Sequence, residues 1–185
     1  MVKKKELRQQ QIEKMQQLDR TTRKQYEHDL YDQLFADPDF QAADSIGVTY
    51  SNVFEINTLP IIKEAWQQGK EVYLPRTNPE GHQMNFIQYA KGDKLERSKF
   101  GVLEPLENPE STNNYLDLII VPGLGYTSYP HWRVGFGGGY YDRFLAKYPA
   151  TTISLAFPFM AFESPKWTTY PHDRLINRVL VAKGS

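Results

Sequence analysis

The stretch from Asp117 to Lys147 constrains the fold more than any other part of this chain; it reads DLIIVPGLGYTSYPHWRVGFGGGYYDRFLAK. Four apolar residues lead to a Pro-Gly pair, and a polar, aromatic loop then reaches Gly135 and the triplet Gly137 to Gly139, after which a helical pattern begins. A buried strand that runs through a glycine-rich turn into a helix is a common phosphate-binding arrangement. The glycines allow backbone N–H groups to approach an anion, and the helix N-terminus attracts negative charge.

Charged residues around these glycines favour an anion site, although the pattern leaves two interpretations open. Arg133 and Arg143 flank the glycines, and Asp142 is a candidate ligand of a magnesium ion carried by phosphate groups. The stretch matches neither G-x-x-x-x-G-K-[ST] nor G-x-G-x-x-G, the two common nucleotide-binding patterns. The residues alone therefore predict either a nucleotide-binding loop or a tight turn whose glycines only relieve steric strain.

Composition narrows the class of protein. The chain has 185 residues, which predicts one domain with a substantial core, and its 22 basic and 22 acidic residues predict no general attraction to nucleic acid or to a membrane surface. It contains no cysteine, which excludes disulfides and thiolate catalysis and suits the cytoplasm. No segment approaches the length of a transmembrane span. We therefore expect a soluble, cytoplasmic protein.

Helical and extended patterns alternate along the chain. We expect helices at 3–18, from Asp19 to near Asp37, at 58–68 and at 138–147, and strands at 45–50, 71–74, 83–89, 118–121, 153–157 and 178–182. Thr58 is expected to cap its helix and Pro75 to end the second strand, while residues 91–114 are predicted to be an irregular surface excursion. The alternation predicts an α/β fold: a single three-layer domain, 1–185, with a mostly parallel central sheet flanked by helices.

Two charged clusters lie far from the glycines in the sequence. Lys4, Lys5 and Arg8 belong to the first predicted helix, and Lys4 and Arg8 are spaced to project from one face toward a shared anion. The alternative is a solvated run of charge. Asp173 lies in a proline-containing loop before the last strand and is a candidate second magnesium ligand; the alternative is a surface aspartate beside Arg174.

Polar residues also follow the first predicted strand. In an open α/β sheet, ligands bind beyond the carboxyl ends of the strands, and Asn52, Glu55 and Asn57 lie there. Glu55 and Asn57 are suited to the edge of a heterocycle. The alternative is local, because Asn57 and Thr58 are also typical residues for the start of a helix.

The pattern R-x-G-x-G-G-G-Y-Y-D-R, after an apolar strand that ends in P-G-L, resembles the signature of the 5-formyltetrahydrofolate cyclo-ligases (methenyltetrahydrofolate synthetases). The resemblance extends from about Lys4 to Val181. It includes an N-terminal K-x-x-L-R element and the pair Glu104-Pro105. It also includes an E-x-[DE]-T element, from which Asn57 departs because an acidic residue is common there.

This resemblance implies an enzyme that uses ATP and Mg²⁺ to convert 5-formyltetrahydrofolate, with or without a polyglutamate tail, to 5,10-methenyltetrahydrofolate. The formyl oxygen would be phosphorylated and N10 would then attack the activated carbon. Arg133 and Tyr140 are implied to be catalytic, and Asp142 and Asp173 to bind the metal. The residues implied to bind ATP are Lys4, Lys5, Arg8, Arg133, Val134, Gly135, Phe136, Gly137, Gly138, Gly139, Tyr140 and Tyr141. Those implied to bind folate are Asn52, Glu55, Asn57, Phe136, Gly137, Gly138, Gly139 and Tyr140.

Two other classes of function fit the same sequence. One is a small kinase or sugar-phosphate isomerase that uses the glycine loop for another phosphorylated substrate. The other is a non-catalytic protein that binds folate or nucleotide. For the enzyme that the resemblance implies, we expect a monomer with a small-molecule substrate and no nucleic-acid or membrane partner.

Overall fold

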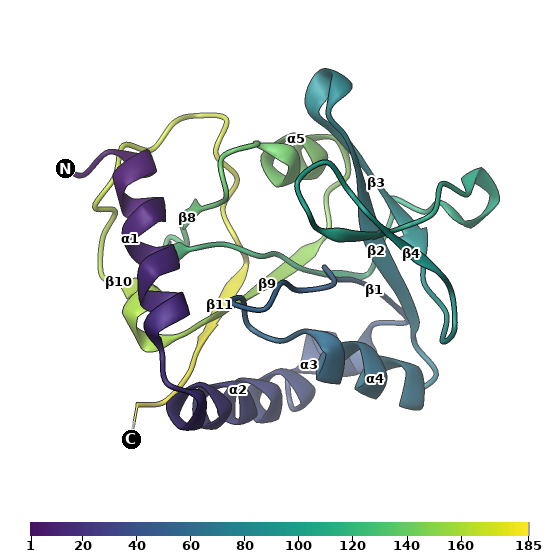
Figure 1. Ribbon diagram of the computed structural model, residues 1–185, viewed down its shortest axis with the longest axis horizontal. Coiled ribbons are helices and arrows are strands. Elements are labelled where there is room, and N and C mark those ends of the chain that lie inside the picture. The colour runs from purple at the N-terminus through teal and green to yellow at the C-terminus, as the bar shows by residue number, and fades with distance from the viewer. Residues whose placement is uncertain (185) are drawn as a thin grey trace.

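The computed structural model describes residues 1–184, which form an α/β domain (Figure 1). The helices are α1 (Lys4–Gln17), α2 (Arg20–Phe35), α3 (Pro38–Ala42), α4 (Leu59–Gln67) and α5 (Tyr140–Lys147). The strands are β1 (Ser45–Gly47), β2 (Glu71–Asn78), β3 (Gln83–Gln88), β4 (Leu95–Arg97), β5 (Leu103–Pro105), β6 (Leu118–Ile120), β7 (Gly125–Thr127), β8 (Arg133–Val134), β9 (Thr151–Ala156), β10 (Ala161–Phe162) and β11 (Arg178–Val181).

A six-stranded sheet in the order β11-β9-β6-β1-β2-β3 forms the centre of the domain. Every neighbouring pair is parallel except β2 and β3, which form an antiparallel hairpin at one edge. The prediction of a mostly parallel sheet is therefore confirmed. The strand before the glycines, β6, lies inside this sheet, and all three of its residues are buried.

Helices cover both faces of this sheet. Figure 1 shows α2, α3 and α4 along one face and α5 on the other. On the first face, buried side chains such as Leu34 and Ile62 pack against Ile46 of β1. On the second, Phe144 of α5 meets Phe86 of β3 edge-on, with ring centroids 5.0 Å apart. The predicted three layers are present. Within residues 1–184, no helix is both long and apolar enough to cross a membrane.

The prediction that Pro75 ends the second strand is wrong, because β2 continues to Asn78 and Pro75 pairs with Phe86 of β3. The backbone of Tyr73, two residues earlier, hydrogen-bonds toward β1, where its carbonyl accepts from Val48 N–H. Pro75 faces the same side, beyond the end of β1. No ladder hydrogen bond is lost there, so the missing N–H is tolerated.

The start of α4 also differs from the prediction. The Thr58 hydroxyl does not cap the helix but donates to the carbonyl of Thr49, at 2.6 Å. The Asn57 side chain instead accepts from Leu59 N–H, at 3.1 Å. Thr58 therefore ties the start of α4 to the chain that leaves β1, and this contact holds the intervening loop against the sheet.

Several short elements were not predicted. The small sheet β10-β7-β8 packs beside α1, and residues 91–114, expected to be irregular, contain the hairpin β4-β5. Helix α3 follows Asp37 directly, whose carboxylate accepts from Asp39 and Phe40 N–H. Each of these elements spans five residues or fewer, which is too short for a hydrophobic period to show in the sequence.

Candidate active site

A cleft of about 900 Å³ lies beside the glycine loop. Its walls come from the start of α1, the segment after β1, strands β2 and β3, the hairpin β4-β5, the glycine loop with α5, and the loop before β11. This volume is typical of a site for one or two small ligands. Predicted site residues that line it are Lys4, Arg8, Asn52, Glu55, Arg133, Gly135, Phe136, Gly137, Gly138, Gly139, Tyr140, Tyr141, Asp142 and Asp173.

Three predicted residues do not line this cleft. Lys5 is exposed on α1, and Asn57 is exposed at the start of α4, where its side chain accepts from the helix backbone. Val134 is buried and packs with Leu7 and Trp167. The structure therefore gives Asn57 and Val134 structural contacts, and Val134 anchors the strand that positions Arg133.

The glycine loop adopts backbone conformations that side chains disfavour. Gly137 has φ +110° and Gly139, the residue before α5, has φ +69°. A Cβ on Gly137 would lie 3.4 Å from the guanidinium carbon of Arg8, and one on Gly139 would lie 2.6 Å from Nη1 of Arg143. The first backbone N–H groups of α5 have no partner within the helix, as at any helix N-terminus. The loop therefore presents bare backbone and a positive helix end to the cleft.

Two arginines lie against this loop, and Arg8 is hydrogen-bonded to it. Arg8 Nε donates to the carbonyl of Gly135 at 2.8 Å, and Arg133 Nη1 donates to that of Pro122 at 2.9 Å. Burial lowers the pKa of Arg8, and the positive charge of Arg133 lowers it further. Arg133 Nε is buried and has no hydrogen-bond partner among the described residues. Two crowded, partly unsatisfied cations favour an anionic ligand.

The two predicted metal-binding carboxylates differ in availability. Asp142 uses only Oδ1 in its contacts, accepting from Arg174 N–H at 2.9 Å and lying 3.7 Å from Arg133 Nη2. Asp173 engages Lys4 with both oxygens, at 3.0 and 3.3 Å. No group of three or more acidic or histidine side chains within residues 1–184 is placed to hold a metal. A metal here would therefore rely on one or two carboxylates and on the oxygens of a ligand.

Tyr140 and Tyr141 begin α5 and face the cleft. Both hydroxyls are buried without a hydrogen-bond partner among the described residues. Burial raises the pKa of Tyr141, so this hydroxyl is a neutral donor at every physiological pH. Buried polar groups rarely go unpaired. These two hydroxyls are therefore candidates to hydrogen-bond a ligand.

Tyr140→Phe tests this interpretation. Because the hydroxyl has no protein partner, we expect its removal to change the free energy of unfolding by less than about 1 kcal/mol. If the hydroxyl binds ligand, we expect kcat/KM to fall by about tenfold or more. Urea denaturation and steady-state kinetics on the same preparation give both numbers. A variant with lower stability and unchanged kinetics would contradict the assignment.

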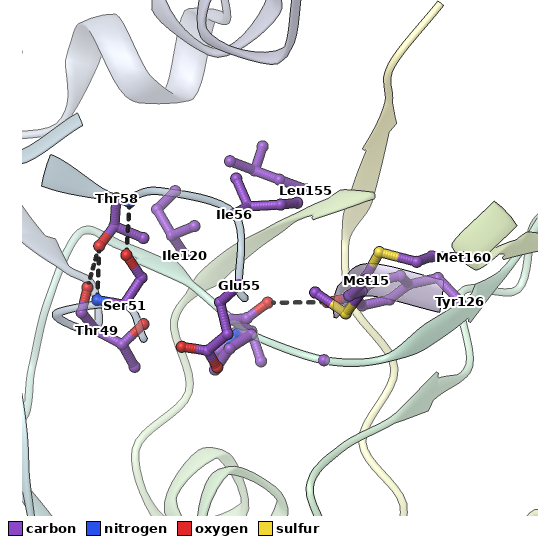
Figure 2. A pocket seen from close by; sticks show the side chains of 13 residues that line it. Met15, Thr49, Ser51, Glu55, Ile56, Thr58, Ile120, Tyr126, Leu155 and Met160 are labelled. Atoms are coloured by element: carbon purple, nitrogen blue, oxygen red, sulfur yellow. Dashed lines mark hydrogen bonds between the residues drawn. The ribbon is translucent and has the colours of Figure 1, made fainter. Parts of the chain in front are cut away.

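Acidic side chains face the cleft opposite the arginines. Glu55 comes from the segment after β1, and its Oε2 accepts from Asn52 N–H at 2.7 Å. It also borders a smaller pocket of about 40 Å³ (Figure 2). Figure 2 shows Glu55 between the polar end of that pocket, with Thr58, and its apolar end, with Met15 and Tyr126. Glu55 and Thr49 therefore border both the small pocket and the open cleft.

Glu104 was not predicted as a site residue, although it lines the cleft and is only 5% exposed. It lies on β5, and the side chain and backbone of Thr77 on β2 both donate to it. The sequence signal was the Glu104-Pro105 pair. Its burial depends on the hairpin folding back onto β2, and spacing along the chain does not reveal this.

These two carboxyl groups predict a pH dependence of stability. Burial raises the pKa of both Glu55 and Glu104 above the ordinary value of 4.5, so the folded protein keeps protons that the unfolded chain releases. The free energy of unfolding should therefore fall as pH rises from 4.5 through the raised values. We expect a weaker fall in the double variant Glu55→Gln/Glu104→Gln. Urea denaturation across this pH range measures the free energy of unfolding of both proteins. If that free energy fell with pH as steeply in the double variant as in the wild type, the prediction would be contradicted.

Comparison with known proteins gives consistent matches. A model of the 5-formyltetrahydrofolate cyclo-ligase family matches residues 1–181. A 5-formyltetrahydrofolate cyclo-ligase of Haemophilus influenzae is 34% identical over 106 residues, 56% of this chain and 56% of that protein. The corresponding Mus musculus protein is 27% identical over 163 residues, 82% of this chain and 79% of that protein. The matches to the Haemophilus and Escherichia coli K12 relatives span only 56% and 60% of those proteins.

Solved structures agree with the fold. The NMR structure of Aquifex aeolicus 5,10-methenyltetrahydrofolate synthetase superposes with a TM-score of 0.79 at 26% identity, covering 98% of this chain and 90% of that one. A 5,10-methenyltetrahydrofolate synthetase from Mycoplasma pneumoniae, 18% identical, has a TM-score of 0.72 and supports the fold alone.

Proposed function

This chain belongs to the 5-formyltetrahydrofolate cyclo-ligase family, and we propose that it converts 5-formyltetrahydrofolate to 5,10-methenyltetrahydrofolate at the expense of ATP, with Mg²⁺, releasing ADP and phosphate. The observation that carries the proposal is that one cleft combines a glycine loop at a helix N-terminus with two arginines and a wall of apolar and acidic side chains. A phosphate donor and a heterocyclic acceptor fit together in such a cleft.

The chemistry explains why both ligands are needed. The oxygen of the formyl group on N5 is a poor leaving group. Transfer of the γ-phosphoryl group of ATP to that oxygen gives an activated N5-iminium phosphate. N10 then attacks the formyl carbon and loses its proton. The carbon–oxygen bond breaks, the oxygen leaves with phosphate, and the five-membered ring closes. No protein nucleophile is required, so catalysis depends on positioning and on charge stabilisation.

Residues of the loop suit the phosphate groups. The backbone N–H groups of the glycine triplet and the N-terminus of α5 would hold the phosphates. Arg133 and Arg8, whose guanidinium groups lie against the loop, would neutralise charge that shifts during transfer. Lys4 would join them after leaving Asp173. This exchange would couple the position of α1 to occupancy of the cleft.

Magnesium fits this cleft through Asp142 in particular. Its Oδ2 accepts no hydrogen bond within residues 1–184, and a carboxylate oxygen is a preferred magnesium ligand. Asp173 would bind only by releasing Lys4. When bound, Mg²⁺ would offset the charge of the phosphate oxygens.

Folate would occupy the remaining part of the cleft. Phe136, which lines the cleft, is 44% exposed, and the cleft-lining Tyr140 has a buried hydroxyl with no partner within residues 1–184. This position suits contact with the formyl group. Glu55 and Asn52 would contact the heterocycle from the segment after β1. We further propose that the protein acts as a monomer in the cytoplasm.

Absorbance of the methenyl product tests the proposed function. Purified protein is mixed with 5-formyltetrahydrofolate while ATP and Mg²⁺ are each supplied or withheld. We expect an absorbance rise only when all three are present. A flat trace from folded protein that still binds nucleotide would refute the proposal. ATP hydrolysis independent of folate would then favour a kinase-type enzyme, and tight binding without turnover a non-catalytic binding protein.

A further inference from the structure

Glu104 is a buried carboxylate in the cleft to which the proposed mechanism gives no role. Thr77 Oγ1 and Thr77 N–H both donate to its Oε1, at 2.6 and 3.2 Å. Within residues 1–184, its Oε2 accepts no hydrogen bond. One oxygen is therefore fixed on β2, and the other is available to a ligand in the cleft.

The charge of Glu104 is poorly compensated by the protein. The guanidinium of Arg76, whose charge lowers the pKa of Glu104, is shared with Glu96, with which it pairs, and with the carbonyl of Pro105, to which it donates. Burial raises the pKa of Glu104, which indicates that the ionised form lacks sufficient partners. A ligand that brings N–H donors to Oε2 would supply the missing partners. Hydrogen bonds to a buried charged group are among the stronger hydrogen bonds in proteins.

The surroundings of Glu104 suggest the shape of such a ligand. Pro75, Met84, Phe100 and Val102 line the same wall of the cleft, which comes from β2, β3 and the β4-β5 hairpin. The phosphate-binding groups come from α1, β8 and α5. The wall around Glu104 therefore suits a flat ring with apolar faces and an edge of N–H donors, held apart from the phosphates.

We propose that Glu104 binds the 2-amino and N3–H donors of the reduced pterin ring and makes the cleft selective for a 2-amino-4-oxopyrimidine edge. This inference rests on the proposed function. In 5-formyltetrahydrofolate these two donors are adjacent on the pyrimidine ring, and the formyl group is carried by the other ring. The molecule can thus reach Glu104 with one ring and present the formyl oxygen to the glycine loop with the other.

A double-mutant cycle between protein and ligand tests this contact. The wild type and Glu104→Gln are each assayed with 5-formyltetrahydrofolate and with its 2-desamino analogue. For the wild type, we expect loss of the amino group to raise KM for the folate about 10- to 100-fold. We expect Glu104→Gln to raise KM for the parent compound by a similar factor. In the variant, loss of the amino group should then cost less than about threefold.

Controls separate binding from folding. Glu96→Gln removes a carboxylate of the same hairpin that does not line the cleft, and it should leave KM for the folate unchanged. KM for ATP and kcat should be unchanged in Glu104→Gln. If that variant does not fold, Glu104→Asp, which keeps the charge on a shorter side chain, takes its place in the cycle.

Equal KM values for the two ligands with the wild type would overturn the inference. Equal discrimination by the wild type and by Glu104→Gln would also overturn it, because another group would then recognise the edge. Both results leave the proposed function intact. Absence of methenyl product from the wild type with 5-formyltetrahydrofolate would instead refute the proposed function, and this inference with it.

Discussion

Arg133→Ala is expected to lower kcat/KM for ATP by about 100- to 1,000-fold, the largest loss that we predict for a single side chain. The guanidinium donates to the carbonyl of Pro122 and lies against Gly135 of the glycine loop, and the side chain is only 5% exposed. Charge stabilisation is strongest where water is excluded. A loss of this size therefore follows if Arg133 neutralises a transferring phosphoryl group.

Two variants control for other causes. Arg133→Lys keeps the charge but not the planar fork, and we expect an intermediate loss. Arg20→Ala removes an exposed arginine at the start of α2, and we expect wild-type kinetics. Thermal denaturation shows whether each variant is folded. Wild-type turnover by Arg133→Ala at both saturating and limiting ATP would contradict the role assigned to Arg133.

Gly137→Ala is expected to weaken ATP binding by at least about tenfold. At φ +110° a Cβ is strained, and it would also meet the guanidinium of Arg8 at 3.4 Å. To relieve this strain the loop would relax to a conformation that points its N–H groups elsewhere. Titration calorimetry with a non-hydrolysable ATP analogue measures the change.

Gly92→Ala is the matched control for this variant. Gly92 has φ +91°, so alanine is strained there too, but no atom lies within 4 Å of its added Cβ and the residue does not line the cleft. We expect both variants to lower the free energy of unfolding by about 1–3 kcal/mol and only Gly137→Ala to lose ATP affinity. Equal ATP affinity in both would show that the loop does not hold the nucleotide.

The sequence predicted the parts of the fold whose causes are local. The apolar run at β6 and the helix start at Asp19, whose carboxylate caps α2, carry their signals in adjacent residues. The course of β2 through Pro75 was not predictable, because it depends on where a neighbouring strand ends. Tertiary pairing determines where a strand ends, so the rule that proline ends a strand fails at Pro75.

In the candidate site, too, local sequence signals were sufficient for some residues and not for others. The glycine loop could be predicted because positive φ angles require glycine, and Arg8 because its spacing from Lys4 is helical. Glu104 could not be assigned, since its partner Thr77 lies 27 residues away on another strand. Asn57 was predicted to bind folate, and this stays a prediction; in the structure its side chain accepts from the start of α4. A polar residue beside a helix start can serve the helix or a ligand, and its place in the sequence does not distinguish the two roles.

The fate of the formyl oxygen tests most directly the claim that this cleft transfers a phosphoryl group to that atom. The protein is incubated with ATP, Mg²⁺ and 5-formyltetrahydrofolate that carries oxygen-18 in its formyl group, and the released phosphate is analysed by mass spectrometry. Our account predicts one labelled oxygen in each phosphate formed with the methenyl product. Unlabelled phosphate, with the label recovered in water, would contradict it, because ring closure would then proceed without phosphorylation of the formyl oxygen.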